Sequence, residues 1–164
     1  MALTQNELKE LLDYNPETGE FIWKVDRSHK VKAGDIAGCS SVIRGYKRIC
    51  IDYRNYAQHR LAFLYMTGKW PDKLVDHING NRSDNRWCNL RQANDVENAC
   101  NKAMQSNNTS GHIGIWKPKG RNKFVVQVRG KHVGYCETLE EAKEVYHREA
   151  SKQFGEFYRQ QEIA

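Results

Sequence analysis

The sequence predicts an α+β protein, in which short strands and amphipathic helices are grouped into small modules along 164 residues. Three observations lead to this fold class. Capping-box patterns begin helices near both ends of the chain, at Thr4 and at Thr138. Residues 45–56 alternate between apolar and polar side chains, as a half-buried strand does. Residues 73–105 have the pattern of strand, loop, strand and helix. A chain of this length suits one ordinary domain or two small ones.

The composition is that of a soluble globular protein, with 39% apolar and 28% charged residues. No apolar run is long enough to span a bilayer, and "MALTQNELKELL" predicts an amphipathic helix rather than a secretory signal. The five cysteines include no C-x-x-C pair, which argues against a disulfide framework and a structural zinc site. We therefore expect reduced cysteines, a cytoplasmic protein and no structural zinc.

The first segment, residues 1–72, is predicted to be an N-terminal α/β region. Thr4 begins a helix, and "YNPETGEFIW" follows as a turn that leads into a strand. The alternation in "GYKRICIDYRNY" predicts one strand with Ile51 and Tyr53 on the same face. "QHRLAFLYMTG" is a short helix that ends at Gly68.

The second segment, residues 73–105, contains the most unusual part of the sequence. "KLVDH" is predicted to be a strand, "INGNRSDNR" a long polar loop and "WCNL" a short return strand. "NDVENACNKAM" follows as a helix with Asn94 as its N-cap. In the loop, Asn79, Asn81 and Asn85 are expected only to shape the backbone.

Residues 106–111 are a predicted linker to a third segment, residues 112–159. This segment holds three short strands, "HIGIWKP", "KFVVQV" and "KHVGYC", and a helix that begins at Thr138. Trp116 and Tyr135 are expected in the core of so small a unit.

The charge distribution indicates an acidic partner. The net charge is +6, and no Asp or Glu occurs from Asn98 to Cys136. The seven positive residues of that stretch are Lys102, Lys117, Lys119, Arg121, Lys123, Arg129 and Lys131. Such a block suits a phosphate backbone, although a solvated basic face gives the same pattern.

The stretch "VDHINGNRSDNRWCNL" supplies residue types that phosphodiester hydrolysis needs. A neutral histidine is the natural base near pH 7, and oxygen ligands suit a hard divalent cation. Neighbouring strand residues point to opposite faces, so Asp76 can bind a metal while His77 activates a water. Asn98, in the first turn of the following helix, could supply a second oxygen ligand, and Asn89 could hold the His77 ring by hydrogen bonding.

The residues "VDHINGNRSDNRWCNLRQANDVEN" resemble the HNH nuclease motif, the ββα-metal fold, in the form found in phage and intron-encoded homing endonucleases. The resemblance implies that His77 is the general base, that Asn89 orients it, and that Asp76 and Asn98 bind Mg²⁺ or Mn²⁺. Asn98 stands where the motif's name has a final histidine, as is common in the homing branch.

The third segment resembles AP2 domains, with a Gly-x-x-Trp motif, a basic second strand and Gly-Tyr before a Thr-capped helix. Such domains lay a three-stranded sheet into the DNA major groove. Arg121, Lys123, Arg129 and Lys131 are expected to alternate along two strands, so that several share one face. The candidate DNA contacts are Arg60, Arg82, Arg86, Lys117, Lys119, Arg121, Lys123, Arg129 and Lys131. His59 is expected to pack against its own neighbours.

The sequence thus predicts a divalent-metal-dependent, homing or nicking endonuclease for double-stranded DNA, with a C-terminal AP2-like domain. The resemblance implies a phage or other mobile-element origin and action in the host cytoplasm, and we expect a monomer or weak dimer without membrane contact. Two alternatives remain open. One is an AP2-type DNA-binding regulator without nuclease activity, and the other is a nuclease acting on RNA or structured DNA.

Overall fold

The computed structural model describes residues 3–43, 45–100 and 111–158. The chain forms two compact units, an N-terminal unit of residues 1–95 and a C-terminal unit of residues 96–164. The predicted linker, residues 106–111, lies outside the described residues except for Gly111. None of the described helices has the length and apolar character that crossing a membrane demands.

The N-terminal unit begins with the predicted capped helix, α1 (Gln5–Leu11). The Thr4 side chain accepts a hydrogen bond from the Glu7 backbone N–H, and the Glu7 carboxylate accepts one from the Thr4 backbone N–H at 2.8 Å. The reciprocal bonds confirm the predicted capping box. Strands β1 (Leu12–Asn15), β2 (Glu20–Trp23) and β3 (Ile36–Ala37) then form an antiparallel sheet in that order.

The predicted single strand at residues 45–56 is instead a hairpin. A second sheet contains β4 (Cys39–Ile43), β5 (Tyr46–Ile51) and β6 (Arg54–Ala57). Asp52 and Tyr53 have φ angles of 48° and 64°, so the chain reverses at these two residues. Tyr53 is therefore fully exposed at the turn, and the prediction that it shares the inward face of Ile51 is wrong.

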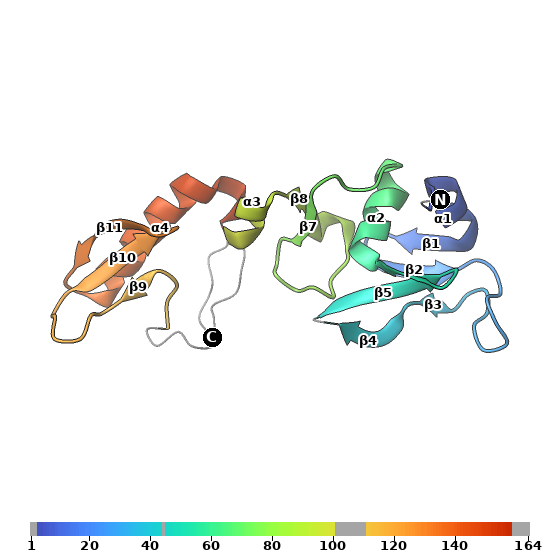
Figure 1. Ribbon diagram of the computed structural model, residues 1–164, viewed down its shortest axis with the longest axis horizontal. Helices are drawn as coiled ribbons and strands as arrows, with labels where there is room; N and C mark the ends of the chain where they lie inside the picture. Colours follow the sequence, from blue (N-terminus) through green and yellow to red (C-terminus); the bar gives the residue numbers. More distant parts are fainter. Residues whose placement is uncertain (1–2, 44, 101–110, 159–164) are drawn as a thin grey trace. The chain divides into compact units, whose positions relative to one another are not determined.

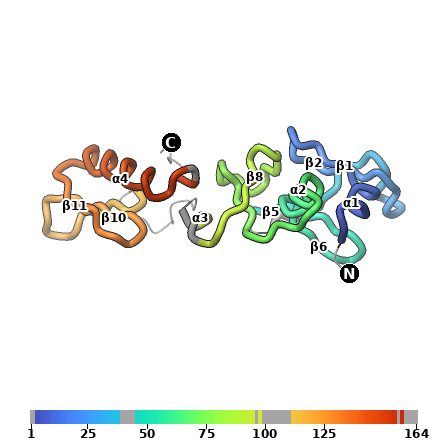
Figure 2. The backbone as a smooth tube through the Cα atoms, turned by 90° about the horizontal axis from the view of Figure 1, so that it is seen from above, coloured from blue at the N-terminus to red at the C-terminus, as the bar shows by residue number. Residues whose placement is uncertain are grey.

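Helix α2 (Gln58–Thr67) ends at Gly68 as predicted, with this glycine in the left-handed conformation at φ 76°. It packs beside α1 (Figure 2). The Gln5 side chain of α1 donates to the Tyr65 carbonyl at 2.7 Å. On the buried side of α2, Leu61 and Leu64 belong to the core of the unit.

The predicted strand, loop, strand and helix of the second segment are present. Strand β7 (Leu74–His77) pairs antiparallel with β8 (Leu90–Ala93), and helix α3 (Asp95–Cys100) follows. The return strand begins later than predicted, because Trp87–Asn89 forms a 3₁₀ turn, η1, in place of strand. Val75 and Leu90 join the same core as Leu8, Phe21 and Leu61, so segments 1–72 and 73–95 fold around one core.

The C-terminal unit contains the three predicted strands and the predicted helix. Strands β9 (Ile115–Trp116), β10 (Phe124–Val128) and β11 (Lys131–Cys136) form an antiparallel sheet in the order β11-β10-β9. Helix α4 (Leu139–Phe154) lies across one face of this sheet, and η2 (Gly155–Phe157) follows it (Figure 1). The core between sheet and helix includes Val126 and Ala142, both fully buried.

Candidate active site

The β7–β8 hairpin places the Asp76–His77 pair in a buried position at the end of β7. Asp76 is 6% exposed and His77 is 3% exposed. Their cross-strand partners on β8 are Arg91 and Leu90. Both side chains are therefore withdrawn from bulk water, which strengthens every electrostatic interaction that they make.

Asp76 forms a buried ion pair with its cross-strand partner Arg91. The Arg91 Nε and Nη2 atoms donate to Asp76 Oδ2 at 3.0 and 2.9 Å. This geometry holds one oxygen of the carboxylate against the Arg91 guanidinium. A carboxylate is a fitting oxygen ligand for Mg²⁺ or Mn²⁺, which takes one or two protein oxygens and retains water in its other positions.

His77 contacts an amide and two aromatic rings. Its Nε2 atom lies 3.1 Å from Oδ1 of Asn85, and its ring lies 5.2 Å from that of His59 and 5.9 Å from that of Tyr46, between centroids. Burial lowers the pKa of His77, against the opposing effects of Asn85 and Asp76. The imidazole is therefore neutral near pH 7, the form that accepts a proton.

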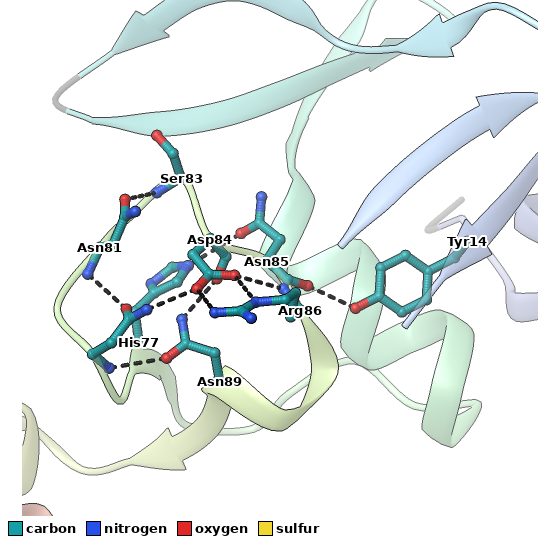
Figure 3. Close-up of polar contacts among 9 residues, drawn as sticks. Tyr14, His77, Asn81, Ser83, Asp84, Asn85, Arg86 and Asn89 are labelled. Carbon is teal, nitrogen blue, oxygen red and sulfur yellow. Dashed lines mark hydrogen bonds and ion pairs between the residues drawn. The ribbon is translucent and has the colours of Figure 1, made fainter. Parts of the chain in front are cut away.

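Asn89 holds the loop that follows His77. Its Oδ1 accepts from the Asn79 backbone N–H at 2.9 Å, and its Nδ2 donates to the Asp84 carbonyl at 2.8 Å. Figure 3 shows this side chain bridging the two ends of the loop. These bonds fix the loop backbone at Asn79 and at Asp84, whereas the contact at His77 Nε2 is made by Asn85.

Asp84 and Arg86 form a second ion pair in the same loop. The Arg86 Nη2 and Nε atoms donate to the Asp84 carboxylate at 2.6 and 2.8 Å. These bonds, with a smaller contribution from Asn79, lower the pKa of Asp84 to about 2. Arg86, a candidate phosphate contact, is thus engaged within the loop while remaining about half exposed.

The β1–β2 hairpin contacts the end of this loop, at residues 85–87. The Tyr14 hydroxyl donates to the Asn85 carbonyl at 2.7 Å (Figure 3), and the Trp87 backbone N–H donates to the Pro16 carbonyl at 2.9 Å. Gly19, at φ 74°, lies so close that an added Cβ would stand 2.4 Å from the Asn85 and Arg86 backbones. The N-terminal hairpin therefore fixes the position of Asn85.

His59, expected to pack against its neighbours, does so at the start of α2. It is 9% exposed, and its ring lies 5.1 Å from that of Tyr46. Burial, with smaller contributions from His77, Arg60 and Arg48, lowers its pKa to about 3. Its Nδ1 atom is buried without a hydrogen-bond partner.

The other proposed metal ligand, Asn98, lies on α3, in the C-terminal unit and half-buried. The division between the units falls between Asp76 and Asn98, so the pairing of these two ligands stays a prediction. Within the described residues, no cluster of three or more His, Cys, Asp or Glu side chains could by itself hold a metal ion.

Two candidate phosphate contacts of the N-terminal unit lie over aromatic rings. The Arg82 guanidinium is 5.1 Å from the ring centroid of Tyr46, which itself borders His77. Arg60 lies 5.9 Å from the Trp70 ring, and its Nη2 donates to the Pro71 carbonyl at 3.4 Å. Arg82 is thus connected to His77 through a single intervening ring.

The basic residues of the C-terminal unit do not alternate along two strands as predicted. Arg121 and Lys123 lie in the β9–β10 loop, Arg129 is in the tight β10–β11 turn at φ 51°, and Lys131 begins β11. β9 and β10 are shorter than the predicted stretches and β11 has the predicted bounds, and the charges gather in the loop and the turn at the two ends of the sheet. All six candidates are exposed: Lys117, Lys119, Arg121, Lys123, Arg129 and Lys131.

The sheet face opposite α4 carries exposed aromatic side chains. Trp116, Val125 and Tyr135 are aligned across the three strands. Trp116 is 39% exposed and Tyr135 is 55% exposed, so the prediction that they belong to the core is wrong. The helix covers only one face, and alternation along the strands turns these residues to the other.

Sequence reasoning missed Gln58 and the contact of Asn85 with His77. Gln58 is buried, and its Oε1 accepts from Asn85 Nδ2 at 2.9 Å. Asn85 was expected only to shape the loop, yet it is 2% exposed. No spacing rule points to this pair, because 27 residues separate the two partners.

Comparison with known proteins finds similarity to HNH endonucleases. Residues 56–100 match the family model described as HNH endonuclease, a segment that includes Asp76, His77, Asn89 and Asn98. An uncharacterised HNH endonuclease of Acanthamoeba polyphaga mimivirus is 34% identical over 104 residues, which cover 60% of this chain and 54% of that protein. The chain thus spans about half the length of this relative. No solved structure matches. Residues 56–100 are therefore similar to an HNH endonuclease domain.

Proposed function

We propose that this protein is a divalent-metal-dependent endonuclease that hydrolyses phosphodiester bonds in double-stranded DNA, with His77 as the general base. The observation that carries this proposal is the buried Asp76–His77 pair on β7, within the segment that matches HNH endonucleases. The pair combines a carboxylate, which can bind a cation, with a neutral imidazole, which can accept a proton, and hydrolysis requires both tasks.

In the reaction, His77 takes a proton from a water molecule as the water oxygen forms a bond to phosphorus. The bond from phosphorus to the 3′ oxygen breaks, leaving a 5′-phosphate and a 3′-hydroxyl. Burial favours the neutral imidazole that this step needs. One such site acts on one strand, so a single chain nicks DNA, and a double-strand break requires two chains or two visits.

Asp76 and Asn98 are the residues that would hold the divalent ion. Both present oxygen atoms, the donor type that Mg²⁺ and Mn²⁺ prefer. When bound, the ion neutralises charge on the phosphoryl oxygens and on the departing 3′ oxygen. Arg91 pairs with the buried Asp76 carboxylate from the neighbouring strand.

The C-terminal unit supplies DNA affinity, in the manner of an AP2-like domain. Support comes from its exposed lysines and arginines and from the open aromatic face of its sheet. Lysine and arginine side chains bind phosphates, and exposed aromatic rings contact sugars or bases. Arg60, Arg82 and Arg86 of the N-terminal unit are proposed to contact the backbone near the cut.

Relaxation of supercoiled plasmid tests the function. Purified protein with Mg²⁺ or Mn²⁺ is expected to nick the plasmid, and EDTA is expected to stop it. His77→Ala should lower the nicking rate at least a hundredfold, because removal of a general base costs about 10²–10⁴ in rate. DNA affinity in a gel shift at fixed salt should stay within about twofold, because the substitution removes no positive charge that binds phosphate.

The same assay separates this function from that of a DNA-binding regulator. DNA binding without nicking under both metals would support the regulator and contradict the endonuclease. Wild-type nicking by His77→Ala would keep the nuclease but remove His77 from its proposed role.

A further inference from the structure

The contact between His77 and Asn85 indicates which imidazole nitrogen carries the proton. His77 Nε2 and Asn85 Oδ1 are 3.1 Å apart, and both residues are almost fully buried. Taken alone, the pair allows two arrangements, because an imidazole nitrogen either donates or accepts and an amide group can be flipped. The neighbours of Asn85 remove this ambiguity.

A chain of side-chain amides leads from Asn85 to a backbone carbonyl. Asn85 Nδ2 donates to Gln58 Oε1 at 2.9 Å, and Gln58 Nε2 donates to the Ala37 carbonyl at 3.0 Å. A carbonyl oxygen only accepts hydrogen bonds, so the Gln58 amide has its nitrogen at Ala37. Gln58 then presents oxygen to Asn85, and Asn85 in turn presents oxygen to His77.

The opposite orientation places like atoms against each other. Flipping Asn85 alone would put its oxygen against Gln58 Oε1, and flipping both amides would put the Gln58 oxygen against the Ala37 carbonyl. Each such contact would bury two acceptors with no donor between them, which is unfavourable because neither oxygen then has a hydrogen-bond partner. Only one arrangement satisfies every member, so Nε2 of His77 carries the hydrogen and Nδ1 carries the lone pair.

Close contacts hold both Gln58 and Asn85 in this amide chain. Gln58 begins α2, and an added Cβ on Gly38 would stand 2.8 Å from its Nε2 atom. The Asn85 carbonyl accepts from the Tyr14 hydroxyl at 2.7 Å. Asn89, by contrast, bonds the backbone of Asn79 and Asp84 and shapes the loop.

We propose that Asn85 and Gln58 are positioning residues that hold His77 in the Nε2–H tautomer, so that Nδ1 is the nitrogen that takes the proton from water. This role rests on the proposed nuclease function. It assigns the orientation of the base to Asn85 on the loop and Gln58 on α2, and it leaves Asn89 to hold the loop. The tautomer is also a property of the protein without DNA or metal, so it can be measured separately.

Long-range ¹H–¹⁵N correlation spectra of the full chain, with ¹⁵N-labelled histidine at about pH 8, read the tautomer directly, because a neutral histidine is then the dominant form. His77→Gln identifies the His77 signals. The wild-type spectrum should show a protonated Nε2 and an unprotonated Nδ1. Asn85→Ala should give a mixture of both tautomers and lower the kcat of nicking by roughly tenfold to a hundredfold, with little change in KM, because a wrong tautomer impairs a base.

Asn81→Ala is the matched control, because Asn81 is an exposed asparagine of the same loop whose Oδ1 accepts from the Ser83 N–H at 3.1 Å. It should leave the His77 tautomer and kcat unchanged. Gln58→Leu provides a second test if Asn85→Ala fails to fold. It leaves Asn85 free to rotate and should give the same mixture.

Two outcomes would overturn the proposal. One is a wild-type His77 protonated at Nδ1, and the other is an Nε2–H tautomer that persists in both Asn85→Ala and Gln58→Leu. A mixed tautomer in Asn89→Ala, with none in Asn85→Ala, would return the orienting role to Asn89. Absence of nicking by the wild-type protein would contradict the proposed function, whereas the spectra would still decide the tautomer.

Discussion

Two buried histidines give the N-terminal unit a pH-dependent stability. Burial lowers the pKa of His59 from 6.5 to about 3, and it lowers the pKa of His77 in the same direction. Below pH 6.5 the unfolded chain binds a proton at His59 that the folded chain does not, so stability is lost as the pH falls. We expect His59 alone to lower the free energy of unfolding by about 2 kcal/mol between pH 7.5 and pH 5.

Urea unfolding, followed by tryptophan fluorescence at each pH, measures this loss. His59→Gln removes the titrating group, so its free energy of unfolding should fall less steeply over the same pH range. The comparison uses the slope against pH, which the packing cost of the substitution does not affect. Parallel curves for wild type and variant would show that the His59 pKa is not lowered in the folded protein.

The Asp76–Arg91 pair couples the two strands of the nuclease hairpin. Arg91→Met removes the cation from a carboxylate that is 7% exposed, and we expect a loss of about 3 kcal/mol in the free energy of unfolding. Lys32→Met, which breaks an ion pair with both partners more than half exposed, should cost less than about 1 kcal/mol. The two values come from urea titrations at pH 7.5. The double variant Asp76→Asn with Arg91→Met should recover part of the free energy of unfolding that Arg91→Met loses. Equal losses for Arg91→Met and Lys32→Met would contradict a buried ion pair.

At the level of elements, the β1–β2 hairpin is a support for the active-site loop. Gly19→Ala would place a methyl group 2.4 Å from the Asn85 and Arg86 backbones, in a residue at φ 74°. Both the steric overlap and the left-handed backbone oppose the substitution. We expect a loss of about 2–4 kcal/mol in the free energy of unfolding and a marked fall in the nicking rate.

Gly34→Ala is the matched control for this substitution. Gly34 also has a positive φ, 95°, but an added Cβ there would meet nothing within 4 Å. It should show only the backbone cost, about 1 kcal/mol, with an unchanged nicking rate. If the two variants behave alike, the Gly19 turn does not position the loop.

The elements that sequence reasoning could predict are those with local signals. The capping residues Thr4 and Thr138 and the terminal Gly68 begin and end helices through bonds within a few residues. The β5–β6 hairpin was missed because alternation of side chains continues across a two-residue turn, and Asp52-Tyr53 lacks the Asn-Gly signal of such turns. Strand ends in the C-terminal unit were overestimated for a similar reason, since alternation does not show where pairing stops.

The candidate site also contains residues that sequence reasoning could identify and residues that it could not. Asp76 and His77 could be singled out from the sequence as candidates because they are adjacent residues on one predicted strand, whose side chains point to opposite faces. The amide chain could not be found, because it joins β3, α2, the loop and β7 only after the unit has folded. Asn85 is one of several asparagines in the loop, and nothing local distinguishes it from the exposed Asn81.

At the scale of the whole molecule, the two units have separate cores, and the proposed function assigns cutting to one unit and DNA affinity to the other. The N-terminal core joins α1 and α2 to the β1–β2 hairpin, to β5 and to the β7–β8 hairpin. The C-terminal core joins one sheet face to α4. The open face of that sheet, with Trp116 and Tyr135, carries no part of the nuclease pair. Cutting and binding should therefore be separable by substitution.

The salt dependence of DNA affinity tests this separation. Lys117, Lys119 and Arg121 are exposed in the β9–β10 loop. Replacing all three by glutamine should weaken DNA binding. It should also lower the slope of log K against log salt by about 0.9 for each phosphate that the variant no longer neutralises, or about 2–3 in total. The nicking rate at saturating protein should stay within about twofold, because no residue of the N-terminal unit changes.

A triple substitution in the N-terminal unit controls for net charge. Lys9, Lys30 and Lys69 are exposed, and replacing them by glutamine removes the same charge far along the sequence from the loop. Counterion release follows the phosphates that the protein binds directly, whereas a diffuse attraction follows the total charge. The control should therefore keep the wild-type slope. Equal slopes in the two triple variants would show that the β9–β10 loop does not contact DNA, and the affinity would then have to come from other residues.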